Sequence, residues 1–414
     1  MGPSVTTEPG VVEIERLGAQ GDGIVETPSG PRYVPFALPG ECWRLTEGGP
    51  GMLLRKHPAR VEPVCIHFGS CGGCAAQHMP EDLYLTWKRA ILVDALRHRG
   101  IAAPVGPVYR LPAGSRRRAT FYARREGSNL RLGFHRRAEH DLVDVVSCPV
   151  AVPQIVAALP ALREMLAPVV AGATQAAVHV LATTAGLDVH LAFTRASALA
   201  RDYPRLTALA SRFGFARFSV ERDTLMQARR PTLSFDDATV EPPPGAFVQA
   251  SAAAETEMIR LVTAAAAGAR RVGDLFCGIG TFALPLARGS RVLAVDSRED
   301  AVAALLAAAR RAQGRKPVEA RARDLFRTPL SARELDGLDA VVLDPPAAGA
   351  KAQAAQIARS RVPVVVYVSC DPGTLARDAR ILIDAGYRLE SASPIDQFVF
   401  SHHLETVAVF RRHK

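Results

Sequence analysis

The residue best placed to act as a nucleophile is Cys370, at a predicted strand-to-helix turn. The apolar run 362–368 before it is typical of a buried parallel strand. Asp371 and Pro372 have the residue types of an N-cap and a first helical position, and they predict a helix that continues through Ile383. Open α/β sheets bind ligands at the carboxyl ends of their strands, and a helix N-terminus favours thiolate over thiol. A free cysteine is more often simply buried in a core, so this hypothesis depends on the rest of the chain.

A second group of residues has the pattern of a cofactor loop. Residues 273–283, Gly-Asp-Leu-Phe-Cys-Gly-Ile-Gly-Thr-Phe-Ala, follow a predicted strand and open a predicted helix. Glycines at such a turn let the backbone approach a ligand, and Asp296 at the end of the next strand is placed to accept hydrogen bonds from ribose hydroxyls. The loop alone fits both NAD and S-adenosylmethionine, because residues 278–283 also match the dinucleotide pattern G-x-G-x-x-A.

Two features favour S-adenosylmethionine over a dinucleotide. Asp274 precedes Gly278 by four positions, where a carboxylate would repel a pyrophosphate but suits a cationic or hydroxylated ligand. The fourth predicted strand ends in Asp344-Pro345-Pro346, a turn that is common in methyltransferases acting on planar nitrogen or carbon atoms. Such enzymes need little acid–base help with the methyl group itself, because the cofactor supplies a sulfonium leaving group.

Four other cysteines have the spacing of a metal site. Cys65, Cys71 and Cys74 lie close together, with two glycines between the last pair, and Cys148 follows 74 residues later, directly before a proline. Three near thiolates and one distant thiolate suit an iron–sulfur cube, and four thiolates also suit structural zinc. Zinc sites more often consist of two Cys-x2-Cys pairs, so the spacing favours iron–sulfur.

A basic stretch lies between residues 110 and 137. Three aromatic residues, Phe121, Tyr122 and Phe134, are interleaved there with nine arginines: Arg110, Arg116, Arg117, Arg118, Arg124, Arg125, Arg131, Arg136 and Arg137. Guanidinium groups bind phosphates and aromatic rings stack on unpaired bases, so the stretch predicts contact with RNA. The alternative is a set of strands with a solvated charged face. A net charge of +10, from 51 Lys+Arg against 41 Asp+Glu, also favours nucleic acid over a membrane as partner, although a generally basic composition would give the same balance.

The elements that must position these groups fall into three segments of the 414-residue chain. Residues 1–62 alternate short β-like runs with Gly and Pro turns and predict a small all-β barrel. Residues 63–240 are mixed, with a helix predicted at 83–98, and part of residues 79–110 is able to pack on the last segment. Residues 241–414, which start in a proline-rich boundary, alternate strands and helices and predict an α/β domain with a parallel sheet. Its strands are predicted at 271–275, 291–296, 318–322, 340–344 and 362–369, with a helix at 300–313 and a closing antiparallel strand at 397–410.

Composition also bounds the compartment. No apolar run reaches the roughly 18 residues of a membrane span, so no membrane association is expected. The segment 1–9 is polar and has neither the basic nor the apolar region of a secretory signal. Seven cysteines are an odd number without the spacing of a disulfide scaffold, which favours a reducing, cytoplasmic location.

Taken together, four motifs resemble those of the RNA (uracil-C5)-methyltransferases. They are the glycine pair Gly278 and Gly280, Asp344-Pro345-Pro346, Ser369-Cys370-Asp371-Pro372 and Leu404-Glu405-Thr406. The resemblance implies a class I Rossmann-like methyltransferase domain at 241–414, a TRAM-like (OB-like) RNA-binding barrel at 1–62, and a mixed α+β central domain at 63–240 that holds a 4Fe-4S cluster. It is most similar to the subgroup that methylates 23S rRNA, since that subgroup carries both the β module and the cysteines, whereas the tRNA enzymes usually lack them.

The resemblance implies a covalent mechanism. Carbon 5 of uracil is a weak nucleophile, and attack of a thiolate on carbon 6 makes an enolate whose carbon 5 takes the methyl group. In this sequence Cys370 would be the nucleophile, and Glu405 resembles the base that removes the proton left on carbon 5. The alternative for Glu405 is a surface glutamate on a late strand. His402 and His403 beside it are expected to be solvated and are given no role.

The resemblance also implies a set of binding residues and a monomer. Gln249 is similar to a glutamine that contacts cofactor and base. Positions that match cofactor- or substrate-binding positions of the family are Phe276, Gly278, Gly280, Thr281, Asp296, Asp324 and Asp344. The 4Fe-4S cluster of the family is held by the spacing of Cys65, Cys71, Cys74 and Cys148, and we expect it to be structural, because methyl transfer needs no electron transfer.

One position departs from the family pattern. Ala347 stands where an arginine usually follows Asp-Pro-Pro, and Lys351 is the expected substitute. RNA cytosine-C5 enzymes commonly have a cysteine at this position, and amino-group methyltransferases need an aromatic residue there to stack the base. Alanine serves neither chemistry.

Four functions therefore remain to be compared. The first is methylation of a 23S rRNA uridine, and the second is methylation of a tRNA uridine by an enzyme with extra domains. The third is an oxidoreductase that uses NAD and an iron–sulfur cluster, which leaves Asp344, Cys370 and Glu405 unexplained. The fourth is an RNA-binding protein without catalysis, which Ala347 suggests but the presence of a nucleophile and a base opposes.

Overall fold

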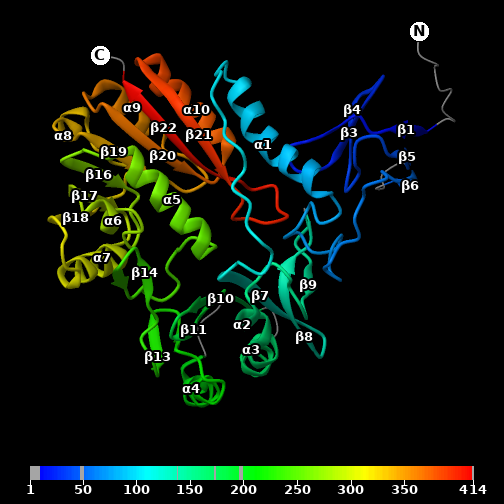
Figure 1. Ribbon diagram of the computed structural model, residues 1–414. Coiled ribbons are helices and arrows are strands. Elements are labelled where there is room, and N and C mark those ends of the chain that lie inside the picture. Colours follow the sequence, from blue (N-terminus) through cyan, green and yellow to red (C-terminus); the bar gives the residue numbers. More distant parts are fainter. Residues whose placement is uncertain (1–9, 47–50, 138, 172–173, 195–198, 413–414) are drawn as a thin grey trace, which may run out of the picture.

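The computed structural model describes residues 10–46, 51–137, 139–171, 174–194 and 199–412 (Figure 1). The prediction about a secretory signal concerns residues 1–9, which lie outside these ranges. Figure 1 shows a small N-terminal β module, a central region built on one sheet, and a C-terminal region built on another.

The N-terminal module consists of two three-stranded sheets. One has the order β1-β5-β6 (Val11–Glu13, Cys42–Arg44, Met52–Arg55), and the other has the order β2-β3-β4 (Arg16–Leu17, Gly23–Thr27, Gly30–Val34). Its small core contains Ile14, Val34 and Trp43. The buried carboxylate of Glu41 accepts hydrogen bonds from the Trp43 indole (3.1 Å) and from Arg60 (2.7 Å), which ties the next part of the chain to this core.

The central region is a seven-stranded sheet of order β13-β12-β11-β10-β7-β8-β9. Its strands are β7 (Arg118–Glu126), β8 (Asn129–His135), β9 (Leu142–Asp144), β10 (Gln175–Thr183), β11 (Gly186–Phe193), β12 (Arg217–Val220) and β13 (Asp223–Gln227). Only β11 and β12 pair in parallel; the other pairs are antiparallel. The same region contains the helices α2 (Pro153–Ala157), α3 (Leu159–Leu166) and α4 (Tyr203–Arg212) and the short 3-10 helix Leu199–Asp202. A two-stranded hairpin of β14 (Leu233–Phe235) and β15 (Ala238–Val240) follows β13 in the sequence.

The C-terminal region has an α/β fold, with a mixed seven-stranded sheet of order β18-β17-β16-β19-β20-β22-β21. The strands are β16 (Arg271–Leu275), β17 (Arg291–Asp296), β18 (Val318–Ala322), β19 (Ala340–Leu343), β20 (Val364–Ser369), β21 (Tyr387–Ile395) and β22 (Glu405–Arg412). The first five are parallel, and β22 runs antiparallel between β20 and β21. The helices are α5 (Ala252–Ala265), α6 (Ala283–Leu286), α7 (Glu299–Arg311), α8 (Ala332–Leu335), α9 (Lys351–Arg359) and α10 (Pro372–Asp384).

The strands β16, β17 and β18 have the predicted bounds, but the prediction of one strand over 397–410 was wrong. Residues 396–404 form a loop, and β22 begins only at Glu405. The loop leaves the sheet because its first residues, Asp396 and Gln397, are buried polar residues that bond to other parts of the chain instead of to a neighbouring strand.

The helix α1 (Glu81–Arg97) belongs to the core of the C-terminal region, although it precedes the central sheet in sequence. Leu92 and Leu96 on α1 are buried together with Leu375 and Leu382 on α10. Figure 1 shows α1 running between the C-terminal sheet and the N-terminal module. Among the residues that the structure describes, no helix combines the length and the apolar character needed to cross a bilayer.

Candidate active site

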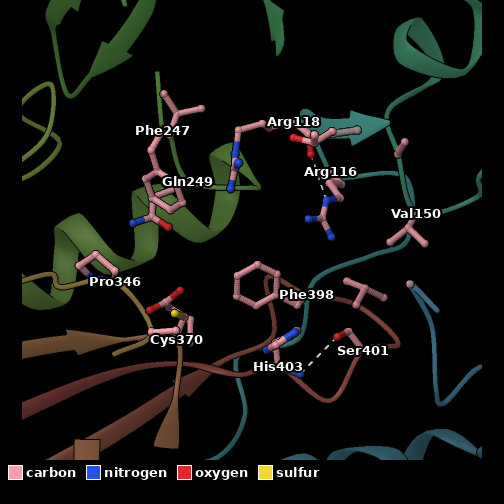
Figure 2. Close-up of a pocket in the computed structure, with 18 of the residues that line it drawn as sticks. Arg116, Arg118, Val150, Phe247, Gln249, Pro346, Cys370, Phe398, Ser401 and His403 are labelled. Carbon is pink, nitrogen blue, oxygen red and sulfur yellow. Dashed lines mark hydrogen bonds between the residues drawn. The ribbon is translucent and has the colours of Figure 1, made fainter. Parts of the chain in front are cut away.

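One cavity of about 800 Å³ contains most of the residues singled out from the sequence. It opens at the carboxyl ends of β16, β17, β19 and β20, and its other wall comes from the start of the central sheet and from the cysteine segment. Figure 2 shows lining residues from four parts of the chain. They are Arg116 and Arg118 at the start of the central sheet, Phe247 and Gln249 before α5, Cys370 after β20, and Phe398, Ser401 and His403 in the 396–404 loop. The predicted nucleophile therefore faces the same space as the predicted cofactor loop.

Cys370 lies where the sequence predicts, between β20 and α10. The side chain of Asp371 caps the helix by accepting the Thr374 N–H at 2.7 Å, and Pro372 occupies the first turn. The expectation that the helix end favours the thiolate was wrong. Burial first, and then the negative charges of Glu405, Asp344 and Asp371, raise the pKa of the Cys370 thiol to about 12, so the resting side chain is a neutral thiol.

Glu405 stands beside Cys370 because of the strand register. The antiparallel pairing of β20 and β22 sets Ser369 opposite Thr406. Cys370, the residue after β20, therefore comes beside Glu405, the first residue of β22. Glu405 is only 3% exposed, which excludes the surface position that was its alternative interpretation. Burial, and then the charge of Asp344, raise the pKa of the Glu405 carboxyl to about 8.

A chain of hydrogen bonds connects the functional side chains. The Gln249 amide nitrogen donates to Asp344 Oδ2 at 3.1 Å, and the Gln249 amide oxygen accepts from Gln397 Nε2 at 2.9 Å. The same Nε2 of Gln397 donates to Glu405 Oε2. Burial, with the charge of Asp296 as the next cause, raises the pKa of Asp344 to about 7. The sequence analysis did not single out Gln397, because it lies in a segment that was predicted to be a regular strand.

Gly278 and Gly280 serve two different purposes in the glycine loop. Gly278 has φ of +51°, and its N–H donates to Asp296 Oδ2 at 2.9 Å at the cavity wall. Gly280 has φ of +95° and is not among the residues that line the cavity; a Cβ there would come within 2.4 Å of Leu305 Cδ1. Gly280 is therefore needed for the packing of the loop against α7.

The other predicted cofactor residues also line the cavity. They are Phe276, Thr281, Asp296, Asp324 and Asp344. The ring of Phe276 lies 5.4 Å from that of Phe326, and Asp324 Oδ1 accepts the Phe326 N–H at 2.9 Å, which holds the two rings on one side of the cavity.

The donor set of the cavity fits a cationic ligand such as S-adenosylmethionine. The carboxyl groups of Asp296 and Asp344 line the cavity, and Asp274 is fully buried close enough to both that their charges act on it. Burial, and then the charge of Asp344, raise its pKa well above the ordinary value. Buried carboxyl groups that raise each other's pKa are stabilised in their ionised form by a nearby positive charge, which a sulfonium carries.

The four predicted metal-binding cysteines gather at the opposite end of the same cavity. Cys65, Cys71, Cys74 and Cys148 all line it. They are close enough that the charges of Cys148 and Cys65 raise the pKa of Cys71, after burial as the larger cause. Over the described ranges, however, no three or more His, Cys, Asp or Glu side chains are arranged to hold a single metal ion. The four side chains are therefore of a type that binds metals, and they line one cavity together.

The turn after Asp344 is held by α10. Thr374 Oγ1 donates to the Ala347 carbonyl at 3.0 Å, and the Arg377 guanidinium donates to the Ala348 carbonyl at 2.9 Å. Lys351, the expected substitute for the missing arginine, is an exposed residue of α9 and does not line the cavity. Because α10 also carries the Cys370 turn at its start, these bonds hold Asp344 and the nucleophile in a fixed relation.

Only part of the basic stretch faces the cavity. Arg116 and Arg118 line it, and the Arg118 guanidinium lies 4.5 Å from the centre of the Phe247 ring, which is 62% exposed. Among the aromatic residues, Tyr122 and Phe134 also line the cavity, whereas Phe121 is fully buried in the central core. Six further arginines of the stretch form side-chain hydrogen bonds within the protein: Arg110, Arg117, Arg124, Arg125, Arg131 and Arg137.

His402 and His403 were expected to be solvated; His402 is half-buried, His403 is exposed, and both line the cavity. Their ring centres lie 4.2 Å apart, and the His403 ring lies 5.7 Å from that of Phe398. Burial, and then the charge of the neighbouring His403, lower the pKa of His402 to about 4, so its ring is neutral at physiological pH.

Comparison with known proteins gives three kinds of match. The model of the tRNA (uracil-5-)-methyltransferase family matches residues 320–413. An uncharacterized RNA methyltransferase of Rhizobium meliloti (strain 1021) is 45% identical over 413 residues, covering 97% of this chain and 99% of that protein. The 23S rRNA (uracil(1939)-C(5))-methyltransferase RlmD of Halomonas elongata is 32% identical over 438 residues, covering 95% of this chain and 88% of that protein.

A solved structure shares the fold over the whole length. The tRNA (uracil-54, C5)-methyltransferase of Pyrococcus abyssi, in complex with S-adenosyl-L-homocysteine, superposes with a TM-score of 0.75 and 24% sequence identity. The match covers 98% of this chain and 100% of that chain.

Proposed function

Because the chain belongs to the RNA (uracil-C5)-methyltransferase family, we propose that it transfers the methyl group of S-adenosylmethionine to carbon 5 of a uridine in 23S rRNA. The observation that carries the proposal is the convergence of Cys370, Glu405 and the glycine loop on one cavity. A thiol, a buried carboxyl and a cofactor loop in one enclosed space are the groups that covalent methylation of a pyrimidine requires. An NAD-dependent oxidoreductase would leave the pairing of Cys370 with Glu405 without a purpose.

In this mechanism Cys370 forms and later breaks a bond to the base. Its thiolate sulfur attacks carbon 6 of the uracil, and the electrons of the C5–C6 double bond make carbon 5 nucleophilic. Bound S-adenosylmethionine supplies an electrophilic methyl group on a sulfonium, which carbon 5 takes. Glu405 then removes the remaining proton from carbon 5, the double bond re-forms, and the sulfur of Cys370 leaves as a thiolate.

The raised pKa of Glu405 suits that role. A carboxyl with a pKa near 8 is a much stronger base than an exposed glutamate, and a base whose pKa lies near the working pH is the most effective. Gln249 and Asp344 would hold the polar edge of the uracil, since their linked amide and carboxyl groups offer a donor and an acceptor at the cavity wall. A base inside a duplex hides carbon 6, so the target uridine has to be unpaired or flipped out.

Three features support 23S rRNA as the substrate. They are the N-terminal β module, which we propose is a TRAM-like RNA-binding domain, the four-cysteine segment, and the similarity to the RlmD protein of Halomonas elongata. The second candidate is a tRNA uridine, because the matching family model and the superposed structure both carry the name of tRNA enzymes. Arg116 and Arg118 at the cavity mouth would bind backbone phosphates in either case.

We further propose that Cys65, Cys71, Cys74 and Cys148 hold a 4Fe-4S cluster, with structural zinc as the alternative. The spacing of three near cysteines and one distant cysteine, without a second Cys-x2-Cys pair, is what favours the cube over zinc. The cluster would tie the segment 65–74 to the chain after β9, and no step of methyl transfer passes through it.

The test is methyl transfer from labelled S-adenosylmethionine to protein-free 23S rRNA and to unmodified tRNA, followed by nucleoside analysis. We expect label in 5-methyluridine from 23S rRNA only, and no label with the Cys370→Ala variant. Label in tRNA alone would keep the chemistry and overturn the substrate. No label in either RNA, with anaerobically prepared protein, would overturn the proposed function.

A further inference from the structure

Gln397 is a buried amide whose three hydrogen-bonding contacts are all fixed by the active site. It is 2% exposed. Its Oε1 accepts the backbone N–H of Ala250 at 3.0 Å, and its Nε2 donates to Gln249 Oε1 at 2.9 Å and to Glu405 Oε2. A backbone N–H can only donate, so Ala250 requires the oxygen of the amide on its side. The nitrogen must then face Gln249 and Glu405.

The main chain on both sides of Gln397 is held from α1. Asp396 forms an ion pair with Lys88 Nζ at 2.9 Å and accepts the Tyr84 hydroxyl at 2.6 Å. Lys88 also donates to the carbonyl of Phe398 at 3.3 Å and to that of His403 at 2.5 Å. Lys88 and Asp396 are both fully buried. The backbone at Gln397 therefore cannot shift without breaking a buried ion pair.

The orientation of Gln397 sets the orientation of Gln249. Because Gln397 donates to the oxygen of the Gln249 amide, the nitrogen of that amide is left to face Asp344 Oδ2, at 3.1 Å. Without the donor on Gln397, the Gln249 oxygen loses this partner and the amide is free to turn between two orientations, in one of which its oxygen faces the carboxylate. Two acceptors in contact repel each other, so the polarity of the whole chain of bonds depends on Gln397.

We propose that Gln397 is a positioning residue for methyl transfer, which orients the Glu405 carboxylate toward the substrate carbon and fixes the polarity of the Gln249 amide. The inference rests on the function proposed above. Glu405 acts late in the proposed reaction, since its proton transfer follows thiol attack and methylation. Loss of Gln397 should therefore slow the removal of the proton more than the formation of the covalent bond between Cys370 and the base.

The experiment compares Gln397→Met, which keeps the length of the side chain but removes the donor and the acceptor, with the wild type. The matched control is Gln353→Met on α9, because Gln353 is also a buried amide and bonds to the backbone N–H and carbonyl of Leu330 away from the cavity. Each protein is assayed for kcat and KM with unmodified RNA, and for the denaturation-resistant covalent complex with that RNA. Circular dichroism checks that each variant is folded.

We expect kcat of Gln397→Met to fall about tenfold to a hundredfold, the loss typical of one hydrogen bond to a charged group. We expect KM to stay within about threefold, since neither phosphate-binding arginine is touched. The fraction of RNA in the covalent complex should rise, and Gln353→Met should behave as the wild type. Gln397→Glu, which keeps the acceptor for Ala250, serves as the second variant if Gln397→Met does not fold, and it should give the same rise in covalent complex.

Two results would overturn the inference alone. One is a Gln397 variant that is folded and has wild-type kcat, and the other is a fall in covalent complex that parallels the fall in kcat, because a general structural defect would slow both steps. A wild-type protein that forms neither a covalent complex nor 5-methyluridine would overturn the proposed function, and the inference with it.

Discussion

Ionisation of Glu405 should destabilise the folded protein, and the variant Glu405→Gln should measure by how much. Burial raises the pKa of this carboxyl from the ordinary 4.5 to about 8. Glutamine has nearly the same shape, stays neutral at every pH, and its amide oxygen can accept the hydrogen bond that Gln397 now donates to Glu405. The variant therefore removes the charge with little change in packing.

The size of the effect follows from the two pKa values. Between pH 4.5 and about 8 the carboxyl is protonated in the folded protein and ionised in the unfolded chain, so unfolding releases a proton in this window. Rising pH then favours unfolding, by about 1.4 kcal/mol for each pH unit. Relative to Glu405→Gln, the wild type should lose less than about 1 kcal/mol at pH 5 and about 3–4 kcal/mol at pH 7.5.

The assay is urea unfolding of both proteins at pH 5, 6.5 and 7.5, followed by circular dichroism in the absence of cofactor. The control is Glu319→Gln on β18, which replaces an exposed glutamate. We expect the difference between wild type and Glu405→Gln to grow with pH, and the difference for Glu319→Gln to stay flat. A difference that is independent of pH would refute the argument that Glu405 is buried as a neutral acid. In the methylation assay the same variant should accumulate covalent complex without releasing 5-methyluridine.

Three further outcomes are expected. Gly280→Ala should cost about 2–4 kcal/mol in unfolding free energy, because φ at Gly280 is +95° and the new methyl group would meet Leu305 of α7. The control Gly289→Ala has open space around the new methyl group and should be nearly neutral, and urea unfolding midpoints measure both variants. Lys88→Met should cost about 3–5 kcal/mol, because the buried Asp396 loses its cation at 2.9 Å and keeps only Arg110 at 3.7 Å. A double variant that also converts Asp396 to asparagine should recover much of the loss. Cys148→Ser should lose bound iron, sulfide and visible absorbance while Cys42→Ser keeps them, and iron retained by Cys148→Ser would contradict the proposed cluster.

The elements that depend on local pattern could be predicted from the sequence. The strands β16 and β17 are short, largely apolar segments between helices, β18 alternates apolar and charged residues, and all three have the predicted bounds. The turn at Cys370 was also predictable, because Asp371 and Pro372 are strong helix-start signals and the helix they begin is α10. At these positions each residue type agrees with the fold around it.

What depends on distant partners could not be predicted. The loop 396–404 has the β-like composition of a strand. Contacts of Asp396 with Lys88 and Tyr84, more than 300 residues earlier, and of Gln397 with Ala250 hold it out of the sheet. The ionisation of Cys370 was predicted with the wrong sign for the same reason. The sequence displays the helix start next to the thiol, but not the burial or the two carboxyl groups of Glu405 and Asp344 that the strand order brings beside it.

Those carboxyl groups explain how the site can be inert until a cofactor binds. Burial and mutual repulsion raise the pKa values of Cys370, Asp344 and Glu405 together, so the proposed nucleophile and the proposed base both rest in their protonated forms at neutral pH. A positive charge among these side chains lowers all three pKa values at once, which favours the thiolate and the carboxylate that the reaction needs. Since methyl transfer turns a sulfonium into a neutral thioether, that positive charge is present before the reaction and absent after it. The three pKa values then rise again, and the rise favours a protonated Glu405 at the step in which Glu405 takes the proton from carbon 5.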